Sequence, residues 1–398
     1  MKTPAFDPHN TAVDLARTLE LLQQDPNLSE QNKKTILRFY EACRAEGLRP
    51  LRLLRLLQLM RLIGGSLKKP FDKVTRSDVQ KYLAWLERQE LADWTKHGYK
   101  VALKKFYKWL RNSETYPPEV SWIKTTVNNG HRLLPEELLT EDDVKKMAEK
   151  AEHPRDRALI MVLYEGGFRV GEILGLQIKH VSFDNNGAQI MVAGKTGMRR
   201  VRVIASAPLL TQWLENHPRK EDPSAPLWIG IGTLGRGEAI DYGATRMMLK
   251  RAARRAGLRK AVNPHMFRHS RASSLASKLT EAQLKDMFGW TQSSEMAAVY
   301  VHMSGRDVDK ALLKIHGLAG EEEKEEEEKL KIIKCLRCGE KNAPIAKFCL
   351  KCAAPLDVKT AVEIDRARNE ADEMMNKLLQ DPEVKGLLEQ KIRQLKLA

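Results

Sequence analysis

Helical periodicity runs along almost the entire chain, and one segment interrupts it with strand character. Residues 189–193 and 198–204 are β-rich runs on either side of Gly194-Lys195-Thr196-Gly197, and two such runs around a glycine-bounded turn indicate a β-hairpin. Elsewhere apolar residues recur three and four positions apart, as they do at Val79, Tyr82, Leu83 and Leu86. The pattern predicts a mainly α fold with a small β-hairpin or sheet.

Composition divides the chain into six segments. We expect a helical domain at 12–113, a proline-containing linker at 114–139, a second domain at 140–318, an acidic spacer at 319–330, a cysteine-rich segment at 331–356 and an amphipathic helix at 357–398. Thr140, with three acidic residues after it, is typical of a helix N-terminus and marks where the second domain begins.

The charge of the chain is concentrated in its first 318 residues. The whole chain has a formal net charge of +16, from 68 basic and 52 acidic residues. Residues 319–398 hold 16 basic and 17 acidic residues, which leaves 52 basic against 35 acidic in the first 318. A folded unit with this surplus attracts polyanions such as DNA or RNA, and the alternative is a merely soluble basic surface.

Two classes of protein are excluded by composition. The richest apolar stretch, Leu51–Ile63, is interrupted by Arg52, Arg55, Gln58 and Arg61, so it does not predict a membrane-spanning helix. Five cysteines and an N-terminus without a signal peptide argue against a secreted, disulfide-rich fold. We expect a cytoplasmic protein with no membrane partner.

Three helical stretches carry basic residues that are candidates for contact with nucleic acid. Leu51–Ile63 is either a DNA-contacting helix or a core helix whose arginines extend to solvent. In the second stretch, Lys104 and Lys105 stand beside an apolar stripe that ends at Leu110. The third is the run Arg246, Lys250, Arg251 and Arg254, for which a solvated helix face is the alternative to phosphate contact.

The second domain has no sequence pattern for a phosphate loop, an HExxH zinc site or a carboxylate cluster for Mg²⁺. An enzyme that cuts DNA without a metal must neutralise the phosphate with its own cations, and arginine suits this because its planar fork forms paired hydrogen bonds. Arg169 has Glu172 on its helical face. His265 and Arg268 share a face just after Asn263-Pro264, where a helix begins naturally.

The order of these residues is more specific than any one of them. The chain carries Arg169-x-x-Glu172, a hairpin with Lys195 at its tip, His265-x-x-Arg268-His269, Gly289-Trp290, and Tyr300 followed by His302. This set resembles the tyrosine recombinase family, the Xer-type and phage-integrase-like recombinases of DNA. The resemblance covers residues 140–318, and extends more weakly over 12–113, which resemble the helical core-binding domain of that family.

The resemblance implies a role for each matching position. Arg169 and Arg268 match the two arginines that clamp the scissile phosphate. Lys195 matches the hairpin lysine that protonates the leaving 5′ oxygen, and His265 matches a histidine that assists proton transfer. Tyr300 matches the nucleophile.

Three further positions in the set need comment. Glu172 matches an acidic position that supports the first arginine and a neighbouring histidine. Trp290 stands where most members have histidine; its indole can donate a hydrogen bond to phosphate but cannot act as acid or base. His269, directly after Arg268, is expected to be a structural hydrogen-bonding residue.

The implied chemistry is covalent catalysis on DNA. Attack by Tyr300 gives a 3′-phosphotyrosine link and a free 5′ hydroxyl, so rejoining needs neither ATP nor a catalytic metal or other cofactor. The resemblance implies a site-specific integrase or chromosome-resolving recombinase acting as a homotetramer on double-stranded DNA. The alternatives are a type IB topoisomerase-like enzyme that relaxes supercoils and a non-catalytic DNA-binding regulator.

A pair of Cys-x-x-Cys motifs follows the acidic run. Cys335 and Cys338 are separated from Cys349 and Cys352 by ten residues, the arrangement of a zinc ribbon. Four thiolates form a closed tetrahedral site with structural Zn²⁺, and a reducing cytoplasm favours zinc over disulfides. Members of the resembled family end soon after the tyrosine, so the ribbon and the final helix are additions to the family pattern.

Overall fold

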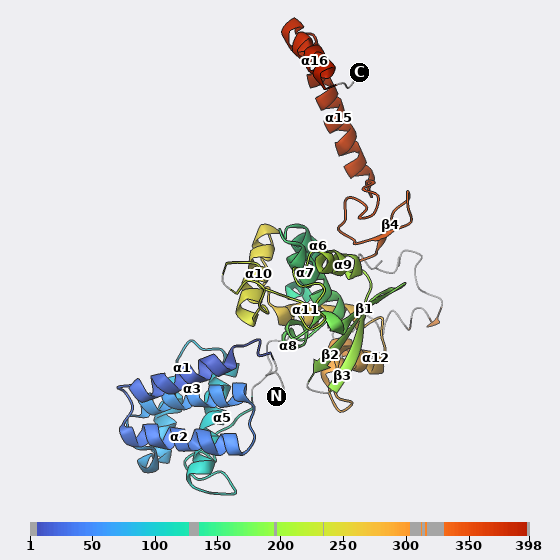
Figure 1. Ribbon diagram of the computed structural model, residues 1–398. Coiled ribbons are helices and arrows are strands. Elements are labelled where there is room, and N and C mark those ends of the chain that lie inside the picture. Colours follow the sequence, from blue (N-terminus) through green and yellow to red (C-terminus); the bar gives the residue numbers. More distant parts are fainter. Residues whose placement is uncertain are drawn as a thin grey trace. The chain divides into compact units, whose positions relative to one another are not determined.

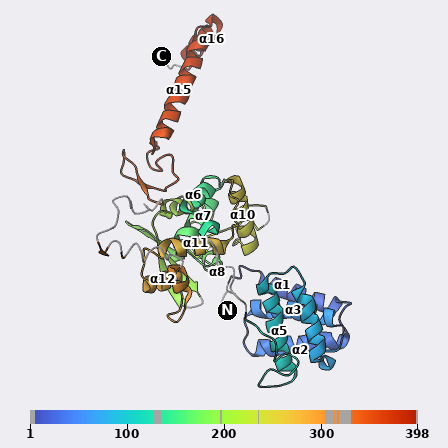
Figure 2. The same cartoon turned by 180° about the vertical axis from the view of Figure 1, so that it is seen from behind.

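The computed structural model describes residues 6–126, 135–194, 197–233, 235–302, 312, 315–316 and 330–395. Contacts divide the chain into two compact units, one containing the N-terminal helices and the other containing the remaining elements. Figures 1 and 2 show that both units are mainly helical and that the sheets are small. This confirms the predicted fold class. Among the described residues, no helix is long and apolar enough to cross a membrane.

The N-terminal unit is a bundle of helices around one apolar core. Its elements are α1 (Thr11–Gln24), α2 (Glu30–Ala45), α3 (Pro50–Leu67), the 3-10 turn η1 (Phe71–Lys73), α4 (Arg76–Glu87) and α5 (Asp93–Leu110). Ser29 and Thr75 begin α2 and α4 because their hydroxyls accept hydrogen bonds from the first free backbone N–H groups. Phe39 of α2 meets Phe106 of α5 edge to face, with ring centroids 5.1 Å apart.

Helix α3 is a core helix. Leu56, Met60 and Ile63 are among its fully buried side chains, and Arg61 extends to Asp25 at 2.8 Å. Of the two interpretations of Leu51–Ile63, the structure therefore supports the buried helix with arginines at its surface.

The segment after α5 is packed rather than extended. Val120 and Ile123 are buried in the core of the N-terminal unit, and Arg111 forms an ion pair with Glu119 at 2.7 Å. The segment predicted as a linker, 114–139, therefore includes residues that pack in the core of the N-terminal unit. Its prolines indicated an irregular backbone but not that this backbone would be buried.

The second unit is built around α7 (Pro154–Gly166), whose side chains from Ala158 onward are all buried. Helices α6 (Glu141–Glu149), α9 (Ala207–Glu215) and α11 (Pro264–Leu275) pack against α7. The other helical elements are η2 (Pro135–Glu137), α8 (Val170–Leu174), η3 (Ile178–His180), α10 (Tyr242–Arg255), α12 (Glu281–Phe288) and α13 (Met296–His302). Figure 1 shows α11 crossing the middle of this unit beside α7.

A three-stranded antiparallel sheet flanks these helices. Strands β2 (Gly187–Gly194) and β3 (Gly197–Val203) form the predicted hairpin, with Ile190 opposite Val201. Strand β1 (Val181–Asp184) adds an edge that the sequence pattern did not predict, because it is short and mostly exposed. Strand β3 contacts α7 and α12, which joins the hairpin to the helical core.

The C-terminal part contains the strands β4 (Ile333–Lys334) and β5 (Lys341–Asn342), followed by α15 (Val358–Leu379) and α16 (Pro382–Gln394). The single helix predicted at 357–398 is thus two helices. Asp381 accepts hydrogen bonds from Glu383 and Val384, and Pro382 has no N–H with which to continue α15. The predicted acidic spacer, apart from Leu330, lies outside the described residues.

Candidate active site

Two glycines in left-handed conformation position the two arginines of the predicted clamp. Gly167 ends α7 at φ 56° and Gly289 ends α12 at φ 57°. The carbonyl of Gly167 accepts a 2.8 Å hydrogen bond from Nη1 of Arg268, and that of Gly289 accepts one of 2.8 Å from Nη2 of Arg169. A Cβ at Gly167 would lie 2.4 Å from the ring of Phe288, so neither backbone conformation nor space tolerates a larger residue there.

Arg268 is held on both sides. Its Nη2 donates to the carbonyl of Phe288 at 2.5 Å, and its guanidinium carbon lies 5.6 Å from the centre of the Trp290 ring. The arginine and the tryptophan of the predicted set are therefore neighbours, although they are far apart in the sequence.

Glu172 joins Arg169 to a third arginine that sequence reasoning missed. Its Oε1 accepts hydrogen bonds from Arg169 at 2.7 Å and from Arg199 at 2.8 Å, while its Oε2 accepts one from Arg199 at 2.9 Å. The expected support of Arg169 is present, but the second partner is this arginine of β3 rather than a histidine. No local pattern identifies Arg199, because its partners are 27 and 88 positions away.

The site holds more positive than negative charge. Burial alone would raise the pKa of Glu172, but hydrogen bonds and charge from Arg199 and Arg169 outweigh it and lower the pKa. Burial lowers the pKa of Arg268 to about 9, and the nearby Arg169 acts in the same direction. Arg268 is therefore still charged at neutral pH. Three arginines and one carboxylate leave two formal positive charges for a bound anion to balance.

Tyr300 lies in an aromatic stack beside these cations. The Trp290 ring is sandwiched between Phe288, at 5.0 Å and 16°, and Tyr300, at 5.7 Å and 6°. The hydroxyl of Tyr300 forms a short hydrogen bond with Nδ1 of His269. Burial raises the pKa of Tyr300 to about 12, with the charge of Arg268 opposing it. The tyrosine is a weak nucleophile until its proton has an acceptor.

The remaining members of the predicted set are placed as follows. His265 lies exposed in the first turn of α11, and its ring centre is 6.5 Å from that of His269, one turn farther along the helix. Lys195 lies outside the described residues; in the sequence it follows Gly194, the last residue of β2. Arg169, Arg268, Trp290 and Tyr300 thus come together, with Glu172 behind them.

The predicted DNA-contact residues divide into two groups. Arg246, Lys250, Arg251 and Arg254 are exposed on α10. Three of them line a groove that leads to Asn263, the residue that caps α11. In contrast, Lys104 donates to the carbonyl of Ile123 and lies 4.2 Å from the Tyr116 ring, while Lys105 pairs with Glu46 at 2.7 Å. These two lysines are engaged within the N-terminal unit, and their contact with DNA stays a prediction.

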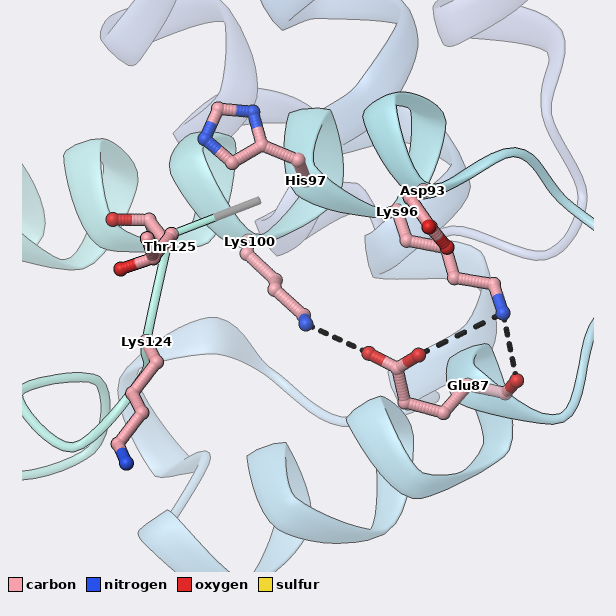
Figure 3. Close-up of a pocket in the computed structure, with 8 residues that line it drawn as sticks. Glu87, Asp93, Lys96, His97, Lys100, Lys124 and Thr125 are labelled. Atoms are coloured by element: carbon pink, nitrogen blue, oxygen red, sulfur yellow. Dashed lines mark hydrogen bonds and ion pairs between the residues drawn. The ribbon is translucent and has the colours of Figure 1, made fainter. Parts of the chain in front are cut away.

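A polar pocket in the N-terminal unit carries none of the predicted catalytic residues. Glu87 lines this pocket, and Figure 3 shows Lys96 and Lys100 reaching toward its carboxylate. The two ion-pair distances are 3.6 and 2.7 Å. The lining has three lysines and two carboxylates, so its positive surplus is smaller than that of the site around Arg268.

The four predicted zinc ligands converge in the C-terminal part. The sulfur atoms of Cys335 and Cys352 are 3.6 Å apart, those of Cys338 and Cys349 are 3.5 Å apart, and all four lie within 4.8 Å of one another. Four thiolates at about 2.3 Å from one Zn²⁺ are separated by ~3.8 Å. The cluster is therefore compatible with a tetrahedral zinc ion.

The chain is similar to known recombinases. Residues 137–306 match the phage integrase family. The chain is 26% identical over 241 residues to "Tyrosine recombinase XerA" of Pyrococcus horikoshii, covering 60% of this chain and 80% of that protein. Two solved structures share its fold. One is the XerH site-specific recombinase bound to palindromic difH substrate, with a TM-score of 0.54 and 20% identity, covering 79% of this chain and all of that one. The other is the Tn1549 transposon integrase with transposon right end DNA, with a TM-score of 0.55 and 18% identity, covering 72% and 99%.

Proposed function

We propose that this chain is a site-specific recombinase of duplex DNA. The proposal is supported by the match of residues 137–306 to the phage integrase family and by the similarity of the chain to a tyrosine recombinase. The observation that carries the proposal is that Arg268 and Tyr300 pack against one tryptophan ring while Arg169 donates to the carbonyl of the preceding Gly289, with two positive charges in excess. A phosphodiester carries one negative charge, and a second develops in the transition state of attack on phosphorus.

Strand cleavage then proceeds through the chain's own side chains. The hydroxyl oxygen of Tyr300 attacks the phosphorus, a phosphotyrosine bond forms, and the bond from phosphorus to the 5′ oxygen breaks. Arg169 and Arg268 have their guanidiniums fixed by backbone carbonyls, so they can meet the phosphate oxygens without reorganisation. Lys195 and His265 are the proposed proton donors to the leaving 5′ oxygen. Because the new bond conserves the energy of the old one, rejoining needs no ATP.

Recognition of the duplex is assigned to both units. We assign Arg246, Lys250, Arg251 and Arg254 of α10 to backbone phosphates, because they are exposed and three of them line the groove that leads to the cap of α11. The N-terminal helical unit supports the recombinase over a type IB topoisomerase-like enzyme, since it resembles a core-binding domain.

The same mechanism implies an assembly. Exchange between two duplexes breaks four strands, and each chain carries one Tyr300, so a homotetramer on paired sites supplies one nucleophile for each break. An integrase and a chromosome-resolving recombinase both meet this requirement. The proposed cysteine ribbon would hold structural Zn²⁺ in each chain and takes no part in the chemistry.

The test compares two DNA reactions of the purified protein. Footprinting over the DNA that flanks its own gene identifies the bound site, and two differently labelled duplexes carrying that site are then incubated with the enzyme. We expect a covalent protein–DNA adduct and exchange of label between the duplexes. Relaxation of supercoiled DNA without exchange would favour the topoisomerase-like alternative, and binding without any adduct would favour the regulator.

A further inference from the structure

The hydroxyl of Tyr300 already has a partner in the site. Nδ1 of His269 and the Tyr300 hydroxyl are hydrogen-bonded, and the two rings lie 5.9 Å apart at 40°. His269 is on α11 and Tyr300 is on α13, so the contact is made by the fold and not by neighbours in sequence. The resemblance to recombinases assigns no chemical role to His269.

The two histidines of α11 face different surroundings. His265 is exposed at the start of the helix, whereas His269, four residues later, is partly buried against the tyrosine. One turn of helix therefore presents one imidazole to solvent and another to the nucleophile.

The surroundings of His269 favour its neutral form. Burial lowers the pKa of His269 below its ordinary value, and the neighbouring His265 and Arg268 lower it further. A neutral imidazole has a lone pair on one ring nitrogen and a hydrogen on the other, and the direction of the bond to Tyr300 depends on which nitrogen holds the hydrogen. With the hydrogen on Nε2, the Tyr300 O–H donates to Nδ1, which is the arrangement that a general base requires.

We propose that His269 is a catalytic residue, the general base that removes the proton from Tyr300 during strand cleavage. As the bond from the tyrosine oxygen to phosphorus forms, the phenolic proton moves to Nδ1 and the imidazole becomes positively charged. The bond to the 5′ oxygen breaks, and that oxygen takes a proton from a different group. In rejoining, the 5′ hydroxyl attacks the phosphorus and returns its proton to the group that had supplied it. The bond from phosphorus to Tyr300 breaks, and the imidazolium of His269 returns its proton to the tyrosine oxygen.

The geometry of substitution at phosphorus requires two separate proton-transfer groups. Attacking and leaving oxygens lie roughly in line on opposite sides of the phosphorus. A residue bonded to the attacking oxygen therefore cannot also protonate the leaving one. His269 serves the attacking side, and Lys195 or His265 serves the leaving side. This inference rests on the proposed recombinase function.

The experiment distinguishes proton removal from Tyr300 and protonation of the leaving 5′ oxygen by changing the leaving atom. Two duplexes carry the bound site, one natural and one with sulfur in place of the bridging 5′ oxygen at the cleaved bond. A thiolate leaves without protonation because its conjugate acid has a pKa of about 8.5, so this substrate bypasses the acid but not the base. We measure the rate of covalent adduct formation for wild-type protein and for His269→Asn, which keeps a hydrogen-bond acceptor near the position of Nδ1 but cannot take up a proton.

Loss of a general base typically slows a reaction by about 10²–10⁴-fold. We expect His269→Asn to bind the duplex normally and to lose at least ~100-fold in adduct formation on both substrates. The matched acid variant Lys195→Ala is expected to be slow on the natural duplex and restored by sulfur. An Asn variant within about threefold of wild type, or one that sulfur restores, overturns the proposal.

Two further measurements keep the proposal testable. His265→Asn changes the other histidine of α11, and if it alone shows the defect that sulfur does not restore, His265 is the base and the proposal is wrong. If His269→Asn fails to bind DNA, His269→Gln is measured instead, and adduct formation above about a tenth of wild type overturns the proposal. Wild-type protein that forms no adduct on either substrate overturns the proposed function itself, and this inference with it.

Discussion

The site around Arg268 and the cluster of four cysteines hold their geometry by different means. Arg268 is fixed by carbonyls at the ends of α7 and α12, helices that belong to a large core, and the side chains of α7 from Ala158 onward are all buried. Two of the cysteines lie between strands of only two residues each, and the other two follow the second strand. Cys335, Ala343 and Cys349 are among the few buried apolar side chains nearby. A segment with so little apolar area cannot order itself by burial.

The two sites therefore differ in the interaction that stabilises their folded geometry. In the second unit, the hydrophobic core stabilises a cluster of like charges that repel one another. In the cysteine cluster, we expect the proposed Zn²⁺ to supply the stabilisation, because metal binding and folding are one process in such small sites. The first site should therefore keep its geometry without any ligand, and the second should keep it only with zinc.

The largest expected effect is the loss of the nucleophile. Tyr300→Phe removes only the attacking oxygen and leaves the stack on Trp290, so DNA binding is expected to persist while covalent adducts fall below detection. Adduct formation is followed by denaturing gel electrophoresis of labelled duplex. An adduct that persists, mapped to Tyr164 or Tyr242, would show that the nucleophile is misassigned.

The next effect concerns the arginine fork. Arg268→Lys keeps the charge but cannot donate to the carbonyls of Gly167 and Phe288 and to a phosphate at once. We expect a loss of about 10²–10³ in cleavage rate, or ~3 kcal/mol of transition-state stabilisation. The same change at Arg169, which has one backbone acceptor, is the comparison. If Arg268→Lys keeps most of its cleavage activity, the proposed need for a guanidinium at this position is wrong.

Glu172→Gln is expected to slow cleavage less than Arg268→Lys does, and its main effect should be on stability. The change leaves Arg199 without its charged partner in a largely buried position, and breaking such a pair costs about 3–5 kcal/mol of unfolding free energy. Asp184→Asn, which alters an exposed ion pair with Arg202, is the control and should change stability little. Urea unfolding measures both. Equal destabilisation of the two variants would contradict the buried network.

The pH dependence of unfolding tests the charge state assigned to Glu172. The pKa of Glu172 is lowered in the folded protein, so its contribution to stability is fully present above the unfolded pKa of about 4.3 and is lost as the pH falls through the folded value. The stability difference between wild type and Glu172→Gln should therefore shrink on acidification. A difference that grows as the pH falls would contradict the assignment of charge.

The smallest effect on cleavage is expected for the cysteines. Cys338→Ser should abolish binding of one zinc per chain and unfold only the segment at about 331–356, while a chain that stops at Gly320 should still form the phosphotyrosine link. Cleavage by the truncated protein should be unchanged in EDTA. Metal analysis and adduct assays test both statements. A truncated protein that folds yet forms no adduct would show that the C-terminal part completes the active site.

Much of this architecture is visible in the sequence because it depends on local patterns. The β2–β3 hairpin follows from β-rich runs around a glycine turn, and α11 begins at Asn263-Pro264, as its capping residues indicate. Arg169 and Glu172 pair as their spacing predicts. These features need only neighbouring residues to be specified.

What sequence reasoning missed depends on tertiary contacts. Arg199 is one of several arginines on β3, and only the packing of that strand against α12 places it beside Glu172 rather than in solvent. His269 forms a hydrogen bond, as predicted, but the sequence does not identify its partner, Tyr300, which lies 31 positions away on another helix. The sequence also does not indicate that the carbonyls of Gly167 and Gly289 accept hydrogen bonds from Arg268 and Arg169, which are distant in the chain.

The surplus of positive charge around Glu172 also sets a limit on heat tolerance. Like charges gathered in a partly buried site lower the stability of the free protein, and an anion that binds only the folded state raises it. DNA should therefore act as a thermal stabiliser of this unit as well as its substrate. An uncharged residue in place of Arg169 would remove one of these repelling charges, and with it the ion pair to Glu172 and one of the arginines proposed to bind the phosphate.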